Sequence, residues 1–238
     1  MRARNPVLRL SHQKLRAGLW RAALAAAVLV AGVGEAGAAT TTATLGNAAP
    51  PFVDGDTPPT VDLAAAQAGQ PAPFDQGKGN EILGPDFTAA WTFVYGAPAD
   101  PIQSASLTLG LADHDSAASG GQVALFAVEL VDLTSVLSLA LEARGGTDAE
   151  YNVYSVDLPS SVFGQLADGT GLVQLQLQGP GLVTPLFPLP GPNPPTESSF
   201  NGAHLVFATL AFETVPEPCA AFFLASTLLA VAALRAGR

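Results

Sequence analysis

A regular alternation of apolar and polar side chains is the feature of this sequence that most restricts its fold. The alternation is cleanest over residues 173–178, where valine and leucine alternate with glutamine, and it recurs over 91–95 and 106–111. Successive side chains of a β-strand point to opposite faces, so each segment fits a strand with one face in a core and one in solvent.

Three further segments rich in Val, Phe, Tyr and Leu are also predicted to be strands: residues 122–130, 150–158 and 203–214. Turn-forming clusters of Gly, Pro, Asp and Ser separate the strands, and the spacing in 131–142 and 160–167 permits a helical turn in each. The proline-rich connection 180–199 is too long for a tight hairpin, so we expect it to cross between sheets. These patterns predict an all-β fold, an antiparallel, jelly-roll-like β-sandwich over residues 86–214.

Residues 39–85 differ in composition from the region that follows. Thr, Ala, Pro, Gly and Gln dominate, large apolar side chains are few, and proline pairs occur at 50–51 and 58–59. This composition indicates a loosely ordered lead-in, with room for one edge strand, rather than a separate domain.

Residues 1–38 have the three parts of a secretory signal peptide. Six basic residues and no acidic residue precede an apolar stretch of twelve residues over 22–33, and Ala36 and Ala38 supply small side chains at an A-x-A cleavage site. We expect cleavage after Ala38, or alternatively after Ala39. An uncleaved N-terminal anchor is the other interpretation, although twelve apolar residues are few for a membrane span.

The last part of the sequence joins a proline-rich acidic motif, an apolar span and two arginines. Residues 219–234 are uncharged and would extend about 24 Å as a helix, against roughly 30 Å of bilayer hydrocarbon. Their Val, Leu and Phe side chains favour insertion by about 2–4 kcal/mol. We therefore expect a transmembrane helix over 219–234, with the terminal arginines in the cytoplasm and the residues before 215 outside. A core helix of a globular domain is the alternative.

Six residues of this tail carry a family resemblance: Val215, Pro216, Glu217, Pro218, Arg235 and Arg238. Their order around the apolar span resembles the PEP-CTERM sorting signal of envelope proteins from Gram-negative bacteria. The resemblance covers residues 215–238 and implies recognition by an exosortase, a membrane-embedded transpeptidase-like enzyme that removes the tail near Pro-Glu-Pro. This chain would be the substrate. It departs from the family pattern in its thin basic cluster, and Cys219 is interpreted as a small apolar residue rather than a lipidation site.

Charge is divided sharply along the sequence. The whole chain has a formal net charge of −10, but residues 39–217 hold nineteen acidic residues against two basic ones, Lys78 and Arg144, a net charge of −17. No basic surface is available to neutralise phosphates, so we expect no nucleic-acid partner. The single cysteine lies in the tail, so no disulfide framework is expected outside it.

A candidate metal site follows the predicted strand 105–111. Asp113 and Asp115 could offer carboxylate oxygens to Ca²⁺, a cation that prefers oxygen ligands. The spacing is not that of an EF-hand, and an Asx-type turn in which the aspartates bond their own backbone is the other interpretation. No other cofactor is expected, and His114 alone is a weak zinc candidate.

No catalytic constellation is recognisable. The three histidines, His12, His114 and His204, belong to no known catalytic motif, although nineteen acidic residues leave a glycosidase-like carboxylate pair open. The predicted function is therefore a non-enzymatic structural or adhesive protein of the cell envelope or the extracellular polysaccharide matrix. The alternative is a carbohydrate-binding or carbohydrate-cleaving module. Three aromatic residues would form a sugar-stacking platform if exposed, although core packing is the expectation for them: Trp91, Tyr151 and Tyr154.

Overall fold

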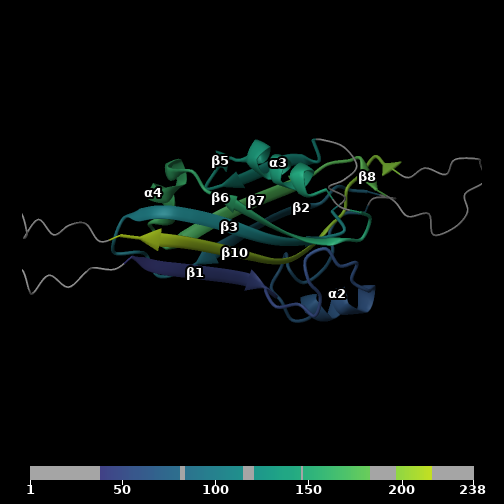
Figure 1. Ribbon diagram of the computed structural model, residues 1–238, viewed down its shortest axis with the longest axis horizontal. Coiled ribbons are helices and arrows are strands. Elements are labelled where there is room, and N and C mark those ends of the chain that lie inside the picture. Colours follow the sequence, from purple (N-terminus) through teal and green to yellow (C-terminus); the bar gives the residue numbers. More distant parts are fainter. Residues whose placement is uncertain (1–37, 81–83, 115–120, 146, 183–196, 216–238) are drawn as a thin grey trace, which may run out of the picture. The chain divides into compact units, whose positions relative to one another are not determined.

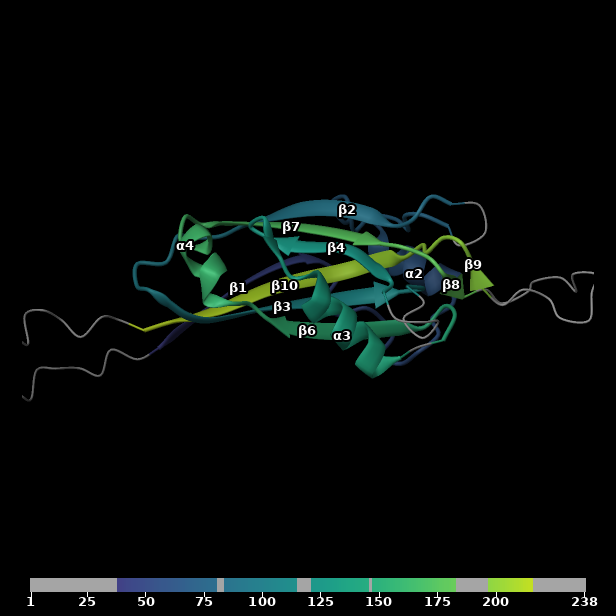
Figure 2. The same cartoon turned by 90° about the horizontal axis from the view of Figure 1, so that it is seen from above.

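The computed structural model describes residues 38–80, 84–114, 121–145, 147–182 and 197–215. Within them, two four-stranded antiparallel sheets pack face to face as a β-sandwich (Figure 1). Figure 2 shows β2, β7 and β4 in one layer and β10, β3 and β6 in the other. The predicted sandwich of antiparallel sheets is thereby confirmed.

The first sheet has the strand order β1-β10-β3-β6, with bounds Ala39–Gly46, His204–Thr214, Ile102–Ala112 and Tyr151–Asp157. The second has the order β2-β7-β4-β5, with bounds Thr88–Val94, Thr170–Leu177, Val123–Val128 and Val131–Asp132. A small separate sheet pairs β8 (Gly181–Leu182) with β9 (Glu197–Ser198). The connection 180–199 leads from β7 in the second sheet to β10 in the first, so it does cross between sheets.

One apolar core fills the space between the two sheets. Leu107, Leu109 and Leu111 of β3 face it, as do Leu175 and Leu177 of β7, and all are almost completely buried. Each such side chain contributes about 1.5–3 kcal/mol through the loss of apolar surface to water. The alternation in the sequence therefore corresponds to a real division between a buried and a solvated face of each strand.

Short helices close the sandwich at one side and at one end. The helix α3 (Thr134–Arg144) contacts β4 and β6 and buries Leu137 and Leu141, which lie one turn apart on one face. A 3₁₀ turn, η1 (Ser160–Val162), and α4 (Phe163–Leu166) precede β7. The helical turns predicted in 131–142 and 160–167 are both present.

The segment between β1 and β2 packs on the outer face of the first sheet. Its helix α2 (Thr60–Gln67) buries Leu63, and Phe52 meets Tyr151 edge to face at 4.8 Å between ring centroids. Gly110 makes room for this second cluster, because a Cβ there would lie 2.4 Å from the Phe207 ring. Residues 39–85 thus contribute an edge strand and a small core of their own, more structure than their composition suggests.

The predicted membrane segments fall largely beyond the described residues. Of the signal peptide 1–38 only Ala38 is described, and the span 219–234 lies outside. Among the helices that the structure does describe, none is both long enough and apolar enough to cross a bilayer.

Candidate functional site

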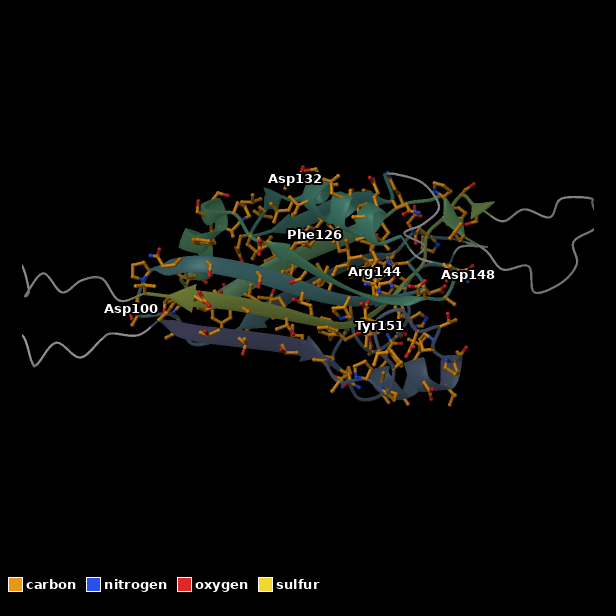
Figure 3. The ribbon with its side chains drawn as sticks, in the orientation of Figure 1. Asp100, Phe126, Asp132, Arg144, Asp148 and Tyr151 are labelled. Atoms are coloured by element: carbon orange, nitrogen blue, oxygen red, sulfur yellow. The ribbon has the colours of Figure 1, made fainter. Side chains whose placement is uncertain are left out.

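The two ends of the sandwich lie together because its first and last strands are paired. Ala39 of β1 is the register partner of Thr214 of β10, and the pairing continues without a shift to Gly46 and Phe207. Both junctions with the predicted sorting segments are therefore at one end of the sandwich, the end that carries Asp100 in Figure 3. We call this the terminal end.

The residues at these two junctions are accessible. Ala38 is exposed, and the side chain of Val215 is 42% exposed. Cleavage after Ala38 would leave β1 whole, whereas cleavage after Ala39 would remove one of the residues paired with β10.

The last strand ends immediately before the predicted sorting motif. β10 finishes at Thr214, and Val215 is the last described residue. A proline at 216 has no N–H to donate to a ladder, which accounts for a strand that stops here. The other predicted processing residues lie outside the described residues: Ala36, Pro216, Glu217, Pro218, Arg235 and Arg238.

A polar pocket lies at the opposite end, which we call the distal end. It has a volume of about 110 Å³ and is lined by four polar side chains, Lys78, Asn80, Asp113 and His204, together with glycines at 77, 79 and 202. Lys78 is held there by two backbone hydrogen bonds of 2.9 Å with Ala203. The lining offers an ammonium and an amide as donors and a carboxylate as acceptor, groups that suit hydroxyl or carboxylate ligands.

His204 connects the pocket to both β10 and α2. It begins β10, and its Nδ1 lies 2.9 Å from Oε1 of Gln67 on α2. Burial lowers the pKa of His204, and the carboxylate of Asp113 acts in the opposite direction. Gly77 lies against the ring, since a Cβ there would be 2.5 Å from the imidazole. The hydrogen bond to Gln67 and the close approach of Gly77 therefore leave the ring little freedom to move.

Asp113, the first predicted calcium ligand, lines this pocket but also stabilises a turn. Its φ of 58° is left-handed, its N–H donates to the Glu150 carbonyl at 3.0 Å, and its Oδ1 accepts from Ala149 N–H at 3.0 Å. Asp115 lies outside the described residues. Among those that are described, no three His, Cys, Asp or Glu side chains gather to hold a metal ion.

A buried polar cluster joins two residues that were considered separately in the sequence, His114 as a weak zinc candidate and Tyr154 as a sugar-stacking aromatic. His114 is 1% exposed, and its Nε2 is hydrogen-bonded to the Tyr154 hydroxyl. Nδ1 of the same ring has no hydrogen-bond partner in the described part of the chain. Asn201 donates to the His114 carbonyl at 3.1 Å. Burial lowers the pKa of His114 to about 4, with Glu150 opposing and Arg144 adding to the effect.

The three aromatic residues considered as a sugar platform are all buried. Trp91 packs edge to face on Phe74 in the main core, at 5.8 Å between ring centroids. Tyr154 belongs to the same core, and Tyr151 to the cluster under α2. They cannot stack on a sugar in this conformation, so the polar pocket is the better candidate for ligand binding.

Sequence reasoning found Asp113 but not the residues around it. Lys78, Asn80 and Gln67 come from a segment expected to be loosely ordered, and only the register of β10 brings His204 to them. A local signal did exist, because Gly77-Lys78-Gly79-Asn80 is a turn-forming run around one of only two basic residues in 39–217. No protein-family model, curated protein or solved structure matches this chain.

Proposed function

We propose that this chain is an exported protein of the cell envelope or extracellular matrix, sorted by an exosortase-type system, with a non-enzymatic structural or adhesive β-sandwich. The segment over 219–234 would hold the precursor in the membrane until the enzyme removes the tail. The observation that carries the proposal is the order of motif, apolar span and arginines over residues 215–238, placed one residue after the end of the last strand.

Two features of the sandwich support this reading of the sorting segments. Both predicted processing junctions adjoin strands that pair with each other, so removal of either flanking segment leaves the register of β1 and β10 intact. β10 ends at Thr214 and Val215 is accessible, which suits an extended substrate for a membrane enzyme.

The proposal assigns no reaction to the polar pocket. Its described lining includes Lys78, Asn80, Asp113 and His204, and the Nδ1 of His204 is hydrogen-bonded to Gln67. The acidic sandwich would act as a structural or adhesive body with this pocket at its distal end.

Mass spectrometry of the mature protein tests the proposal. The full chain is produced in a Gram-negative host that has an exosortase and in the same host with the exosortase deleted. We expect an N-terminus at Ala39 in both hosts, and loss of the residues after the Pro-Glu-Pro motif only where the enzyme is present. An intact C-terminus through Arg238 in exosortase-competent cells would refute it.

Matched variants separate specific sorting from general proteolysis. Changing Pro216, Glu217 and Pro218 together to alanine should preserve the tail even when exosortase is present. Arg235→Lys keeps the terminal charge and should be trimmed like the wild type. Equal trimming of all three proteins would indicate an unrelated protease.

Carbohydrate binding is the second candidate function, and the distal pocket is the observation that favours it. Lys78, Asn80 and Asp113 offer both donors and acceptors for hydroxyl or carboxylate groups of an extracellular polysaccharide. A glycan array probed with the mature protein tests this candidate. Lys78→Ala with Asn80→Ala should abolish any binding, whereas Val94→Ala, an exposed residue of β2, should not.

A further inference from the structure

The two lateral sides of the sandwich differ in how well their edge strands are protected from pairing with another chain. β1 and β2 are the outermost strands of the two sheets on one side, which we call the open side. On the other side α3 contacts β4 and β6, and β5 has only two residues. The β6 edge is also occupied there, since Gly55 donates to the Tyr151 carbonyl and Tyr151 donates to the Asp56 carbonyl.

Within the described part of the chain, the open side lacks the usual devices that prevent edge strands from pairing with other chains. Natural edge strands carry charges, prolines or bulges, or they are covered by another element. β1 (ATTTATLG) and β2 (TAAWTFV) contain no charge and no proline, and both pair with their neighbours without a register shift. These two uncharged edges belong to a body with a net charge of −17 over residues 39–217. An acidic copy can thus approach another here without opposing carboxylates.

The directions of the two strands determine how a second copy could add to them. β1 runs from the terminal end, at Ala39, toward the distal end, because its partner β10 runs the other way. β2 runs toward the terminal end, since the seven-residue connection after Val94 leads to Ile102, the partner of Thr214. β1 and β2 are therefore antiparallel to each other on the same side of the molecule.

A twofold axis parallel to the strands uses both edges at once. Such an axis places β1 of one copy beside β2 of the other in antiparallel orientation, and the symmetry repeats the pair on the opposite sheet. We propose that a second copy of this chain docks on the open side through two β1–β2 pairs, so that the four-stranded sheets of the two copies join into two continuous eight-stranded sheets.

The side-chain pattern on both strands agrees with this pairing. Thr42 on β1 and Ala90 and Thr92 on β2 face outward, whereas Ala43 and Leu45 on β1 face the core and remain half-buried. A register that keeps both cores continuous places Thr42 beside Ala90 or Thr92 of the partner. The half-buried residues of β1 would then lose their remaining contact with water.

The dimer also fits attachment at one surface, and this point alone rests on the proposed function. Because the axis runs along the strands, the paired ends Ala39 and Thr214 of both copies emerge at the same end. Both tails could then reach one membrane. A β1–β1 antiparallel pair would instead point the two tails in opposite directions.

Charge substitution in the full chain tests the pairing. Sedimentation equilibrium in detergent micelles should give a dimer for the wild type. Thr42→Glu with Thr92→Glu places like charges together at both pairs and should weaken the dimer by on the order of tenfold or more. Thr42→Lys with Thr92→Glu should restore it. Ser135→Glu with Ser155→Glu adds the same charge on the closed side and should leave the dimer unchanged.

Cysteine cross-linking identifies which strands meet. In a Cys219→Ser background, Thr42→Cys and Thr92→Cys in the same chain should give a disulfide-linked dimer under oxidation. Each cysteine alone should give none, and a mixture of the two single variants should give the dimer.

Three results would overturn the pairing. They are a monomeric wild type at high micromolar concentration, failure of the Lys–Glu combination to rescue, and cross-linking by Thr42→Cys alone. Protection of the edge by another part of this chain, or by a different protein, would appear as the first of these. Tail trimming measured on the same variants reports the proposed function separately, because neither strand contains a sorting residue.

Discussion

The two ends of β10 carry different kinds of chemistry. At the terminal end Phe212 packs against Tyr95 at 5.2 Å between ring centroids, and the Tyr95 hydroxyl donates to two backbone carbonyls. At the distal end His204 is held by Gln67, and the buried His114 follows β3, the strand that pairs with β10. The strand β10 therefore runs from a polar end of the sandwich to an apolar end.

The two ends of this fold therefore differ in how they are stabilised. The terminal end is closed by an apolar layer and by the pairing of β1 with β10, an arrangement that would tolerate the proposed processing of both flanking segments. The distal end gives up part of its apolar packing to place histidines and amides in the interior, where each must be hydrogen-bonded or remain costly. The following experiments measure how strongly the two ends differ.

The largest expected effect is loss of the terminal apolar layer. Phe212→Ala removes an almost fully buried ring and should lower the free energy of unfolding by about 3–5 kcal/mol. Urea denaturation followed by circular dichroism measures it. Val94→Ala, at a side chain that is 78% exposed, should change stability by less than about 0.5 kcal/mol. Equal effects of the two substitutions would show that the end is not closed as described.

The next effect is acid sensitivity of the distal end. The pKa of His114 is lowered from its usual 6.5 to about 4. Between these two pH values the imidazole therefore binds a proton in the unfolded chain but not in the folded chain. Stability from this group is complete above pH 6.5 and falls as the pH drops toward 4. The loss should reach roughly 3 kcal/mol, measured by urea denaturation across that range.

His114→Gln provides the control, because the amide can still bond the Tyr154 hydroxyl but does not titrate in this range. The variant should lose most of the slope between pH 6.5 and 4. His204, whose pKa is also lowered by burial, should add a weaker slope of the same sign. An unchanged slope in His114→Gln would mean that other groups control acid unfolding.

Strands and helical turns were predicted correctly where their pattern depends on residues close together in the sequence. Alternation located three strands of the sandwich, including β3 with its inward leucines and β7 with its outward glutamines, and the content of Val, Phe, Tyr and Leu located three more. The helical turns were found from spacing for the same reason, since Leu137 and Leu141 lie one turn apart. Strand and helix faces are set by neighbours two to four residues away, so one sequence is enough to find them.

The distal end was missed because its contacts are non-local. Gln67 meets His204 across 137 positions of sequence, and Asn201 meets the His114 carbonyl across 87. The lead-in was underestimated because Phe52 and Phe74 are isolated aromatics without a period, yet both are buried. Asp113 was recognised by its residue type alone, which could not distinguish a turn from a metal ligand.

A smaller effect should follow from filling the space beside His204. Gly77→Ala places a methyl group against the imidazole and should cost about 1–3 kcal/mol, because the half-buried ring is bonded to Gln67 and cannot easily move aside. Gly96→Ala is the matched control, since a Cβ there meets no atom within 4 Å. Thermal unfolding of the two variants measures the difference. Equal melting temperatures would show that His204 is free to move.

The smallest effect concerns Asp113, where the turn and the calcium interpretations can be separated. Asp113→Ala removes the bond to the Ala149 N–H and should cost about 1 kcal/mol, whereas Asp113→Asn keeps an acceptor oxygen and tolerates the left-handed conformation. If the turn alone matters, the asparagine variant matches the wild type in thermal unfolding, with or without a chelator. If calcium binds Asp113 and Asp115, chelation lowers the melting temperature of the wild type but not of the double asparagine variant. We expect the first outcome, because the Asp113 carboxylate already satisfies a backbone N–H at the distal end.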